Sequence, residues 1–293
     1  MLVFYIFLQA KPYKKIIVMT ITRRNLLKQM SICFILFCLG LPAMAQNKGY
    51  LTNRVKTGDL MYLDDQGNEC FIDYREWDKN NPLGELVGVV FYAYYGVEPY
   101  AQDGQPGWHG WLAAIDESGP VAWAPKNTVC YNQCVALYEM EGVSTPWNPN
   151  RDQIHLANAD TCGWQNTYRL LEFLYNGQHT TLSESTSPAF YYLFATKNGV
   201  TDFSVKPEMH RTSWFMPTYG MLRMLYGQMG CLNSALKACG GTQFSHAGSW
   251  YSSTEVGSAY KQAVWSLSWF GNSDTSPLWT KDYTHSVRAI RIF

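Results

Sequence analysis

The segment WYSSTE, residues 250–255, places three hydroxyl side chains beside a glutamate and is the first place to look for serine chemistry. A catalytic serine needs a nearby base, and in many hydrolases it lies on a strained turn of the GxSxG type. Ser252 and Ser253 have no flanking glycine, and the nearest histidine in sequence is His246. We therefore interpret both serines as hydroxyls that bond backbone groups at the end of a strand.

The acidic residues do not show the pattern of a glycosidase active site. A glycosidase needs two carboxylates that face each other across the substrate. The candidates in this chain are Glu98, Asp103, Asp116, Glu255 and Asp274, and no spacing pairs any two of them. The sequence therefore predicts no catalytic residues.

Six cysteines follow residue 45, an even number that is typical of structural disulfides in an exported protein. They are Cys70, Cys130, Cys134, Cys162, Cys231 and Cys239. Short separations favour pairing Cys130 with Cys134 or Cys231 with Cys239, and at least one disulfide is expected. No CxxC pair repeats and no histidine stands at a ligand spacing, so neither a metal nor a cofactor is predicted.

The N-terminal region reads as an export signal. A basic TRRNLLK segment precedes an apolar run at 31–41 and a small-x-small Ala-Met-Ala end at 43–45. This pattern predicts a signal peptide over 1–45, with the real start at Met19 and cleavage before Gln46. The apolar run is too short for a permanent membrane span, so no stable membrane insertion is expected. The general and twin-arginine export routes both stay open, and the expected location is the periplasm, the cell surface or the medium.

Charge and composition narrow the choice of partners. The chain carries 23 Lys and Arg residues against 23 Asp and Glu residues, which gives a formal net charge of zero. Binding to nucleic acid needs a basic excess, so nucleic acid is not a predicted partner. Charged residues make up 16% and aromatic residues 15% of the chain, which is the composition of a globular protein and not of a disordered one.

Hydrophobic patterning predicts strands first and helices later. Strands are expected within 58–74, 86–95, 108–116 and 120–124, and again near the C-terminus at 249–255, 262–271 and 286–293. Helices are expected over 166–177, 187–199 and 218–241, the last ending at a Gly-Gly pair. The Pro- and Asn-rich stretch 144–153 is expected to be a surface loop.

The last third of the chain resembles a known bacterial family. In fixed order it contains SWFMPTYGMLRMLYG, LNSALKACGG, SWYSSTE, AVWSLSWFG and SVRAIRIF. This order resembles the major paralogous domain family, which has a C-type-lectin-like fold related to formylglycine-generating enzymes. It also resembles the C-terminal domains of collagen-like bacterial adhesins. The resemblance runs thinly from residue 58 and is specific only in 214–293.

The resemblance implies an α+β, C-type-lectin-like domain with short twisted antiparallel strands, two or three helices and long irregular loops. It would span 46–293 as a single domain, with an N-terminal β-rich extension at 46–150. WYSSTE would then be a structural signature of the fold. The residues expected to be buried together are Trp214, Trp250, Trp265, Val287, Ala289 and Ile290.

At two sites this sequence lacks the residues that domains of this fold use for calcium binding or for catalysis. Calcium-dependent lectins use Glu-Pro-Asn or Gln-Pro-Asp with Trp-Asn-Asp, and here 98–100 is Glu-Pro-Tyr and 147–149 is Trp-Asn-Pro. Formylglycine-generating enzymes need a C-terminal cysteine pair, which Cys231 and Cys239 do not match in position. Neither calcium binding nor enzymatic activity is therefore expected.

The loops between residues 255 and 286 are the predicted binding face. Aromatic residues mixed with Ser, Asn, Asp and Thr are typical of recognition surfaces, although an irregular β region with polar loops would have the same composition. The predicted ligand-binding residues are Tyr260, Lys261, Trp269, Phe270, Asn272, Asp274, Trp279 and Tyr283. The expected function is an exported binding protein of adhesive type, with a protein or glycan ligand. The alternatives are a self-assembling structural subunit of a surface assembly, or an enzyme of unknown chemistry.

Overall fold

The computed structural model describes residues 2–8, 15–21, 54–97, 106–124, 161–176, 182–245, 248–255, 263–268 and 278–293. The chain divides into two compact units, Met1–Lys48 and Gly49–Phe293. In the first unit, β1 (Leu2–Leu8) pairs antiparallel with β2 (Lys15–Ile21). The apolar run predicted as the core of the signal peptide, 31–41, lies outside the described residues.

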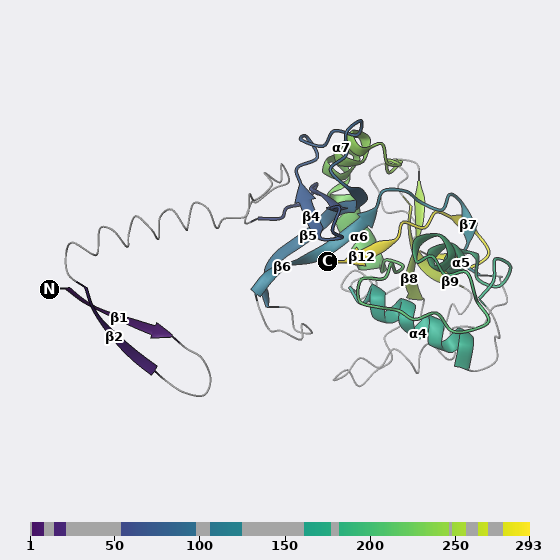
Figure 1. Cartoon of the computed structure of the whole chain (residues 1–293). Helices are drawn as coiled ribbons and strands as arrows, with labels where there is room; N and C mark the ends of the chain where they lie inside the picture. Colours follow the sequence, from purple (N-terminus) through teal and green to yellow (C-terminus); the bar gives the residue numbers. More distant parts are fainter. Residues whose placement is uncertain are drawn as a thin grey trace. The chain divides into compact units, whose positions relative to one another are not determined.

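A five-stranded antiparallel sheet organises the second unit (Figure 1). Its order is β12-β6-β5-β3-β4, so the last strand of the chain lies beside a strand from its first half. The strands are β3 (Leu60–Leu63), β4 (Glu69–Ile72), β5 (Glu85–Val97), β6 (Pro106–Ala114) and β12 (Ile290–Ile292). The predicted strands at 58–74, 86–95, 108–116 and 286–293 all fall in this sheet.

The turn between β3 and β4 follows directly from its sequence. One carboxylate oxygen of Asp64 accepts hydrogen bonds from the backbone N–H groups of Gln66 at 2.9 Å and Asn68 at 2.8 Å. Gly67 has a φ of +79°, a conformation that glycine adopts without a steric penalty. Residues 65–68 thus make a turn that is fixed by local contacts.

Helices lie in the middle of the chain, as the patterning predicts. They are α4 (Gly163–Asn176), α5 (Pro188–Tyr192) continued by the π-helical segment η2 (Leu193–Lys197), α6 (Tyr219–Gly227) and α7 (Met229–Cys239). The described part of the chain therefore combines an antiparallel sheet with separate helices, which is an α+β fold. No helix in this part is long and apolar enough to cross a membrane.

The single helix expected over 218–241 is two helices. Thr218 caps the first by accepting a hydrogen bond from the backbone N–H of Met221. The chain leaves helical geometry at Gln228, where φ is −108° and ψ is 5°. Gly227 and Gly230 flank this residue, and glycine has a low helix propensity, which explains the break. The described fold thus has more helices than the two or three expected.

Two smaller sheets complete the second unit. The strands β8 (Ser249–Glu255), β9 (Ala263–Ser268) and β10 (Leu278–Thr280) form an antiparallel sheet in the order β10-β9-β8. The short strands β7 (Val121–Ala122) and β11 (Thr284–His285) pair with each other. A parallel bridge between Trp250 and Ser286 connects β8 to the C-terminal segment.

Strand alternation gives the five-stranded sheet two different faces. Leu60, Val89 and Ala113 point to one face and pack with side chains of α6 and α7 in the main hydrophobic core. Met61 and Val90 point to the other face. The helices therefore cover one face of the sheet, and the second face has a cluster of its own.

Most of the predicted core is confirmed. Trp250, Trp265 and Ile290 are buried in the main core, and Val287 and Ala289 are buried in a neighbouring cluster with Trp123 and helices α4 and α5. Trp214 is a correction, because it is only partly buried at the edge of that cluster. Its ring lies beneath the ammonium group of Lys197, 5.6 Å from the ring centroid, so one face is used for a cation contact.

The predicted disulfide between Cys231 and Cys239 is wrong. Both cysteines are unpaired and lie on α7, eight residues apart. At 1.5 Å per residue their Cα atoms are about 12 Å apart, whereas a disulfide needs less than about 7 Å. The thiol of Cys231 donates to the backbone oxygen of Thr57. Cys130 and Cys134 lie outside the described residues.

Candidate functional site

The two serines of WYSSTE are structural. Ser252 and Ser253 are fully buried in β8. The Ser252 hydroxyl donates to the backbone oxygen of Trp265 at 2.5 Å, and the Ser253 hydroxyl donates to the backbone oxygen of Pro217 at 3.3 Å. These bonds tie β8 to its neighbouring strand and to the segment before α6, as expected for hydroxyls that bond backbone groups.

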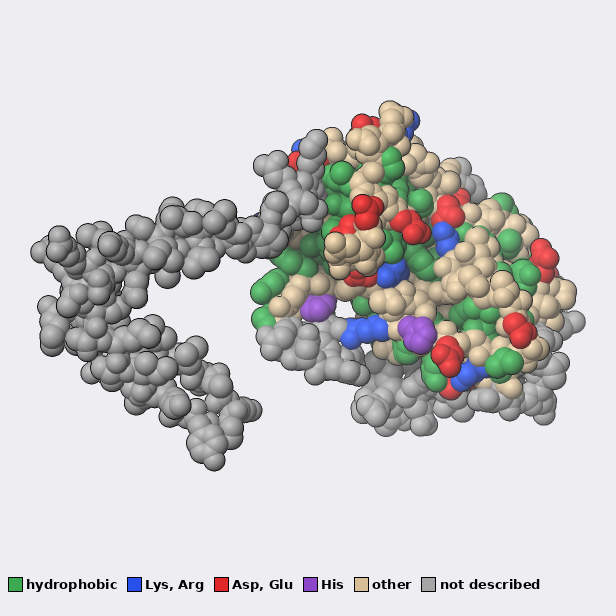
Figure 2. All heavy atoms as spheres, viewed as in Figure 1, with side chains coloured by type: hydrophobic (Ala, Val, Ile, Leu, Met, Phe, Trp, Pro, Cys, Tyr) green, Lys and Arg blue, Asp and Glu red, His purple; other side chains and the backbone are tan. Residues whose placement is uncertain are grey.

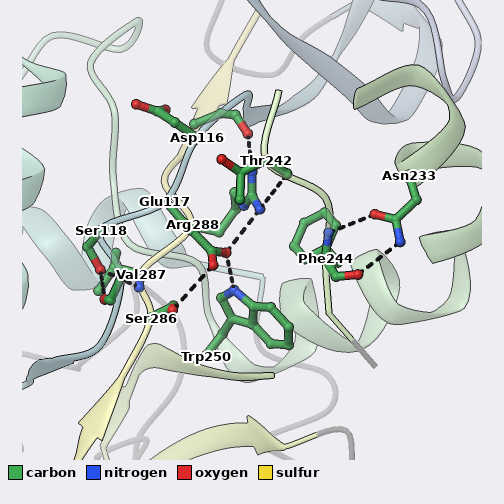
Figure 3. A network of polar contacts seen from close by, with 12 residues as sticks. Asp116, Glu117, Ser118, Asn233, Thr242, Phe244, Trp250, Ser286, Val287 and Arg288 are labelled. Carbon is green, nitrogen blue, oxygen red and sulfur yellow. Dashed lines mark hydrogen bonds and ion pairs between the residues drawn. The ribbon is translucent and has the colours of Figure 1, made fainter. Parts of the chain in front are cut away.

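A buried arginine lies at the centre of the polar network in Figure 3. Arg288 is fully buried, and its guanidinium donates to the backbone oxygens of Ala114 at 3.0 Å and Thr242 at 2.9 Å. It also forms an ion pair with Glu117 at 3.0 Å and lies over the Phe244 ring, 4.3 Å from its centroid. Burial lowers the pKa of Arg288, and the Glu117 carboxylate opposes this effect.

Glu117 connects three segments of the chain through its two carboxylate oxygens. One oxygen accepts from the indole N–H of Trp250 at 2.9 Å and from Arg288, and the other accepts from the Ser286 hydroxyl at 3.4 Å. The carboxylate thus links the β6–β7 connection to β8 and to the C-terminal segment. Because its bonds are made within the protein, we assign this network a structural role.

The neighbouring carboxylate has a different partner. Asp116 points away from Glu117 in Figure 3 and forms an ion pair with Lys197 of η2. Tyr192 is partly buried with its hydroxyl oxygen inside the protein, and this burial raises its pKa, with the Asp116 carboxylate adding to the effect. The two adjacent acids are therefore held by two different cations and do not face each other as a glycosidase pair does.

A metal-ligand arrangement is absent from the described part of the chain. No group of three or more His, Cys, Asp or Glu side chains there could hold a metal ion.

Six of the eight residues predicted for the binding face lie outside the described residues, and they are Tyr260, Lys261, Trp269, Phe270, Asn272 and Asp274. Trp279 is in β10, where its backbone pairs with Val264. Tyr283 follows β10 and is 53% exposed, so it has the accessibility that a ligand-binding side chain needs. That the eight residues share one face stays a prediction.

The second face of the five-stranded sheet carries a compact apolar group, which we call the second-face cluster. Its members are Val55, Met61, Val90 and Leu112, which are buried, and Leu63, Phe71, Val87, Ala93, Trp108 and Phe293, which are partly buried. All except Val55 come from strands of this one sheet or directly follow its last strand. No helix of the described chain contributes to the cluster.

The two edge strands of the sheet meet over this cluster. Arg291 of β12 and Glu69 of β4 form an ion pair at 2.8 Å. The rings of Phe71 and Phe293 lie beside each other with centroids 4.9 Å apart. Because β12 and β4 stand at opposite ends of the strand order, these contacts require the sheet to curl around the second-face cluster. Burial raises the pKa of Glu69, and Arg291 opposes the rise.

An aromatic pair, exposed Tyr95 and partly buried Trp108, extends this face at the end of the β5–β6 hairpin. Tyr95 is 62% exposed and lies edge-on to Trp108, with ring centroids 5.5 Å apart. Figure 2 shows hydrophobic side chains at the surface over this end of β5 and β6. The bulge after Val90 places Tyr95 on the same face as Trp108, because a bulge changes which residues of a strand point to each side of the sheet. Sequence reasoning missed this pair, because it interpreted residues 86–95 and 108–116 only as strands.

No protein-family model matches the chain, and no curated protein matches it. A solved structure does: the crystal structure of a fimbrial protein from Bacteroides ovatus ATCC 8483. The two folds superpose with a TM-score of 0.54 over 82% of this chain, at 14% sequence identity. The match covers 49% of the fimbrial protein, so the chain spans about half of its length. At this identity the similarity establishes a shared fold.

Proposed function

We propose that this chain is an exported, non-enzymatic subunit of a bacterial surface assembly of the fimbrial kind. The single observation that carries the proposal is the fold similarity to the fimbrial protein, which extends over 82% of this chain. The serines of WYSSTE support a non-enzymatic role, because both are buried and bond backbone oxygens. The Glu117 carboxylate likewise has its partners within the protein.

We also propose that the fold is C-type-lectin-like and belongs with the major paralogous domain family. Burial of Trp250 and Trp265, together with the position of Arg288 at the centre of a polar network, supports this assignment. These residues belong to the SWYSSTE, AVWSLSWFG and SVRAIRIF segments that carry the resemblance. In this proposal the three segments specify a scaffold and do not form a catalytic site.

Export of the chain is part of the same proposal. The signal peptide over 1–45, with translation from Met19, would deliver a mature protein that begins at Gln46. The periplasm, the cell surface and the medium are the places where a subunit of this kind would be found.

A ligand-binding, adhesive role is the second candidate. Half-exposed Tyr283 favours it, because this residue belongs to the loop set predicted from the sequence. A protein or glycan would be the ligand. The two roles are compatible, since a subunit of an assembly can also present a binding surface.

The test is to shear surface structures from cells that produce the protein and to collect the high-mass fraction. We expect an antibody to detect the chain there, and N-terminal sequencing of that material to begin at Gln46. Immunogold electron microscopy should place the label on extracellular structures. A matched control is Ile35→Arg, which interrupts the apolar run of the predicted signal and should leave the chain inside the cell. Recovery of the unaltered chain only from the cytoplasm would refute the proposed function.

A further inference from the structure

Two buried serines of β9 have no hydrogen-bond partner in the described part of the chain. Ser266 is fully buried and Ser268 is 4% exposed, and neither side-chain oxygen has a partner there. In sequence they alternate with Trp265 and Leu267, which point into the main core, so both serines point to the other side of the β10-β9-β8 sheet. A buried hydroxyl without a hydrogen bond is costly, and the two serines therefore call for a polar partner.

Strand pairing brings these serines beside two further polar groups. Ser268 is opposite Ser249 of β8, and Ser266 is opposite Tyr251. Directly opposed residues point to the same side of a sheet, with Cβ atoms roughly 4.5–5.5 Å apart. The imidazole of His285 lies on this side too, because it hydrogen-bonds with the Ser249 hydroxyl and packs edge-on against the Tyr251 ring, with centroids 4.6 Å apart. Four residues thus form one group, which we call the polar row: His285, Ser249, Ser268 and Ser266.

The polar row lies at one end of its sheet and borders an exposed aromatic ring. Ser249 is the first residue of β8 and is partly exposed, and Ser268 is the last residue of β9. Tyr283, whose backbone oxygen accepts the Tyr251 hydroxyl, is 53% exposed. The centroid of the Tyr283 ring lies 6.0 Å from that of the His285 imidazole. Exposure therefore falls along the row, from the aromatic ring inward to the two serines without partners.

The chemistry of the row indicates a neutral ligand with hydroxyl groups. A serine hydroxyl both donates and accepts hydrogen bonds, as a sugar hydroxyl does. Burial lowers the pKa of His285 to about 4, so the imidazole is neutral at neutral pH and has one donor and one acceptor. Lys281, close by in sequence, has its ammonium group over the Trp123 ring, 4.8 Å from the centroid. Because the row itself contains no cation, it offers no countercharge to an anionic ligand.

We propose that the polar row binds a neutral sugar unit of a glycan, with the exposed Tyr283 ring packed against the C–H groups of the sugar. Ser266 and Ser268 gain in the complex the hydrogen bonds that they lack without it. This inference rests on the ligand-binding role in the proposed function, and it gives that role a site and a class of ligand. Tyr283 belongs to the loop set predicted from the sequence, and two further members of that set, Trp269 and Phe270, follow Ser268 directly in the chain.

The experiment measures binding of free sugars to the purified mature chain by saturation-transfer NMR titration. The neutral probes are glucose, galactose, mannose, fucose and N-acetylglucosamine, and N-acetylneuraminic acid is the anionic comparison. We expect at least one neutral sugar to bind, and to bind more tightly than the anionic one. The combined change Ser266→Ala and Ser268→Ala should weaken this binding about tenfold or more, because it removes two hydrogen bonds to the sugar. Tyr283→Ala should also weaken it, because it removes the aromatic surface.

Melting temperatures separate a binding role of the two serines from a structural one. Since neither hydroxyl has a partner in the described part of the chain, the double variant should melt at the temperature of the unaltered chain or above it. The matched control is Ser253→Ala, which removes another buried hydroxyl of the same sheet, but one that donates to the backbone oxygen of Pro217. This control should melt at a lower temperature and keep its sugar binding.

Three results overturn the inference. The first is binding of none of the neutral sugars, or tighter binding of the anionic one. The second is unchanged binding in the folded double variant or in Tyr283→Ala, which changes an exposed residue and decides the matter if the double variant does not fold. The third is a double variant that melts as low as Ser253→Ala, because ordered water inside the protein would then already bond the hydroxyls. These results leave the surface-assembly role standing if the chain is found in the sheared surface fraction, whereas its absence there refutes the proposed function itself.

Discussion

Trp250 donates a hydrogen bond from its indole N–H to the carboxylate of Glu117 at 2.9 Å, across 133 residues of sequence. The same carboxylate oxygen accepts from buried Arg288 at 3.0 Å. The tryptophan of WYSSTE, the acid after β6 and the arginine of VRAIRIF are thus parts of one contact. Each of the three segments therefore supplies one partner of a buried polar contact that would be costly to leave unpaired.

Removal of the Trp250 side chain should destabilise the fold strongly. The ring is almost completely buried in the main core. Trp250→Ala should lower the free energy of unfolding by about 3–5 kcal/mol, because it leaves a cavity and removes a hydrogen-bond donor. Trp250→Phe keeps most of the ring volume and should cost less. Urea denaturation measures both variants, and equal stability of Trp250→Ala and the unaltered chain would place the ring outside the core.

Loss of the Glu117 charge should be more costly than loss of its neighbour's charge. Glu117→Gln keeps the size of the side chain and an acceptor for Trp250 but leaves the charge of Arg288 buried without its counterion. We expect a loss of about 3 kcal/mol in unfolding free energy. Chemical denaturation at neutral pH gives this value.

The adjacent acid provides a matched control for Glu117. Asp116→Asn removes the partner of Lys197, but the Asp116 side chain is 47% exposed, and an exposed ion pair contributes at most about 1 kcal/mol. Equal effects of the two substitutions would show that the Glu117 network is no more important than a surface pair.

Acid should destabilise the protein through His285. Burial lowers the pKa of this imidazole from 6.5 to about 4, because the charged form is poorly solvated. The folded state therefore holds His285 neutral, while the unfolded state takes up a proton below pH 6.5. Its contribution, about 3 kcal/mol, is present above pH 6.5 and is lost as the pH falls through 4.

The pH dependence of chemical denaturation tests this prediction. His285→Gln removes the titrating group, so the fall in stability between neutral and acidic pH should become shallower. His210→Gln serves as the control, because the His210 side chain is 75% exposed. A pH profile that His285→Gln leaves unchanged would assign the acid sensitivity to other groups.

Local patterns in the sequence predicted most of the strands and helices of this fold. Contacts between residues far apart in the sequence could not be predicted in this way. The alternation in 58–74 and the apolar run in 86–95 depend only on neighbouring residues, and both became strands of the large sheet. The prediction of one continuous helix over 218–241 is wrong. The low helix propensity of Gly227 and Gly230 breaks the helix at Gln228, although apolar residues recur there at helical spacing.

The candidate surfaces depend on features that sequence patterns do not carry. The pairing of Arg291 with Glu69 exists because the sheet curls, and curling follows from twist and from the bulge in β5. That bulge also places Tyr95 on the same face as Trp108. Conversely, Ser252 and Ser253 were correctly interpreted because a catalytic serine has local requirements that the sequence does not meet.

The cysteines of α7 should behave as two separate thiols. Cys231 and Cys239 are about 12 Å apart along the helix, which prevents a disulfide between them in the folded state. Alkylation of the denatured, unreduced protein, followed by peptide mass spectrometry, should label both. Labelling of the folded protein should be slow, because burial raises the pKa of each thiol and lowers its thiolate fraction. A peptide cross-linked through these two residues would contradict the helix.

The binding face predicted from the sequence can be tested without knowledge of its ligand. Tyr260, Asn272 and Asp274 are expected to be solvent-accessible on one face, where aromatic and polar groups together select a ligand. Replacement of all three by alanine should abolish capture on glycan and protein arrays and leave the thermal melt unchanged, because accessible side chains contribute little to the core. Val205→Ala, an exposed apolar change elsewhere, should keep capture intact. A destabilised triple variant would show that these side chains are packing residues, and a stable variant that still captures ligand would move the binding face to another part of the chain.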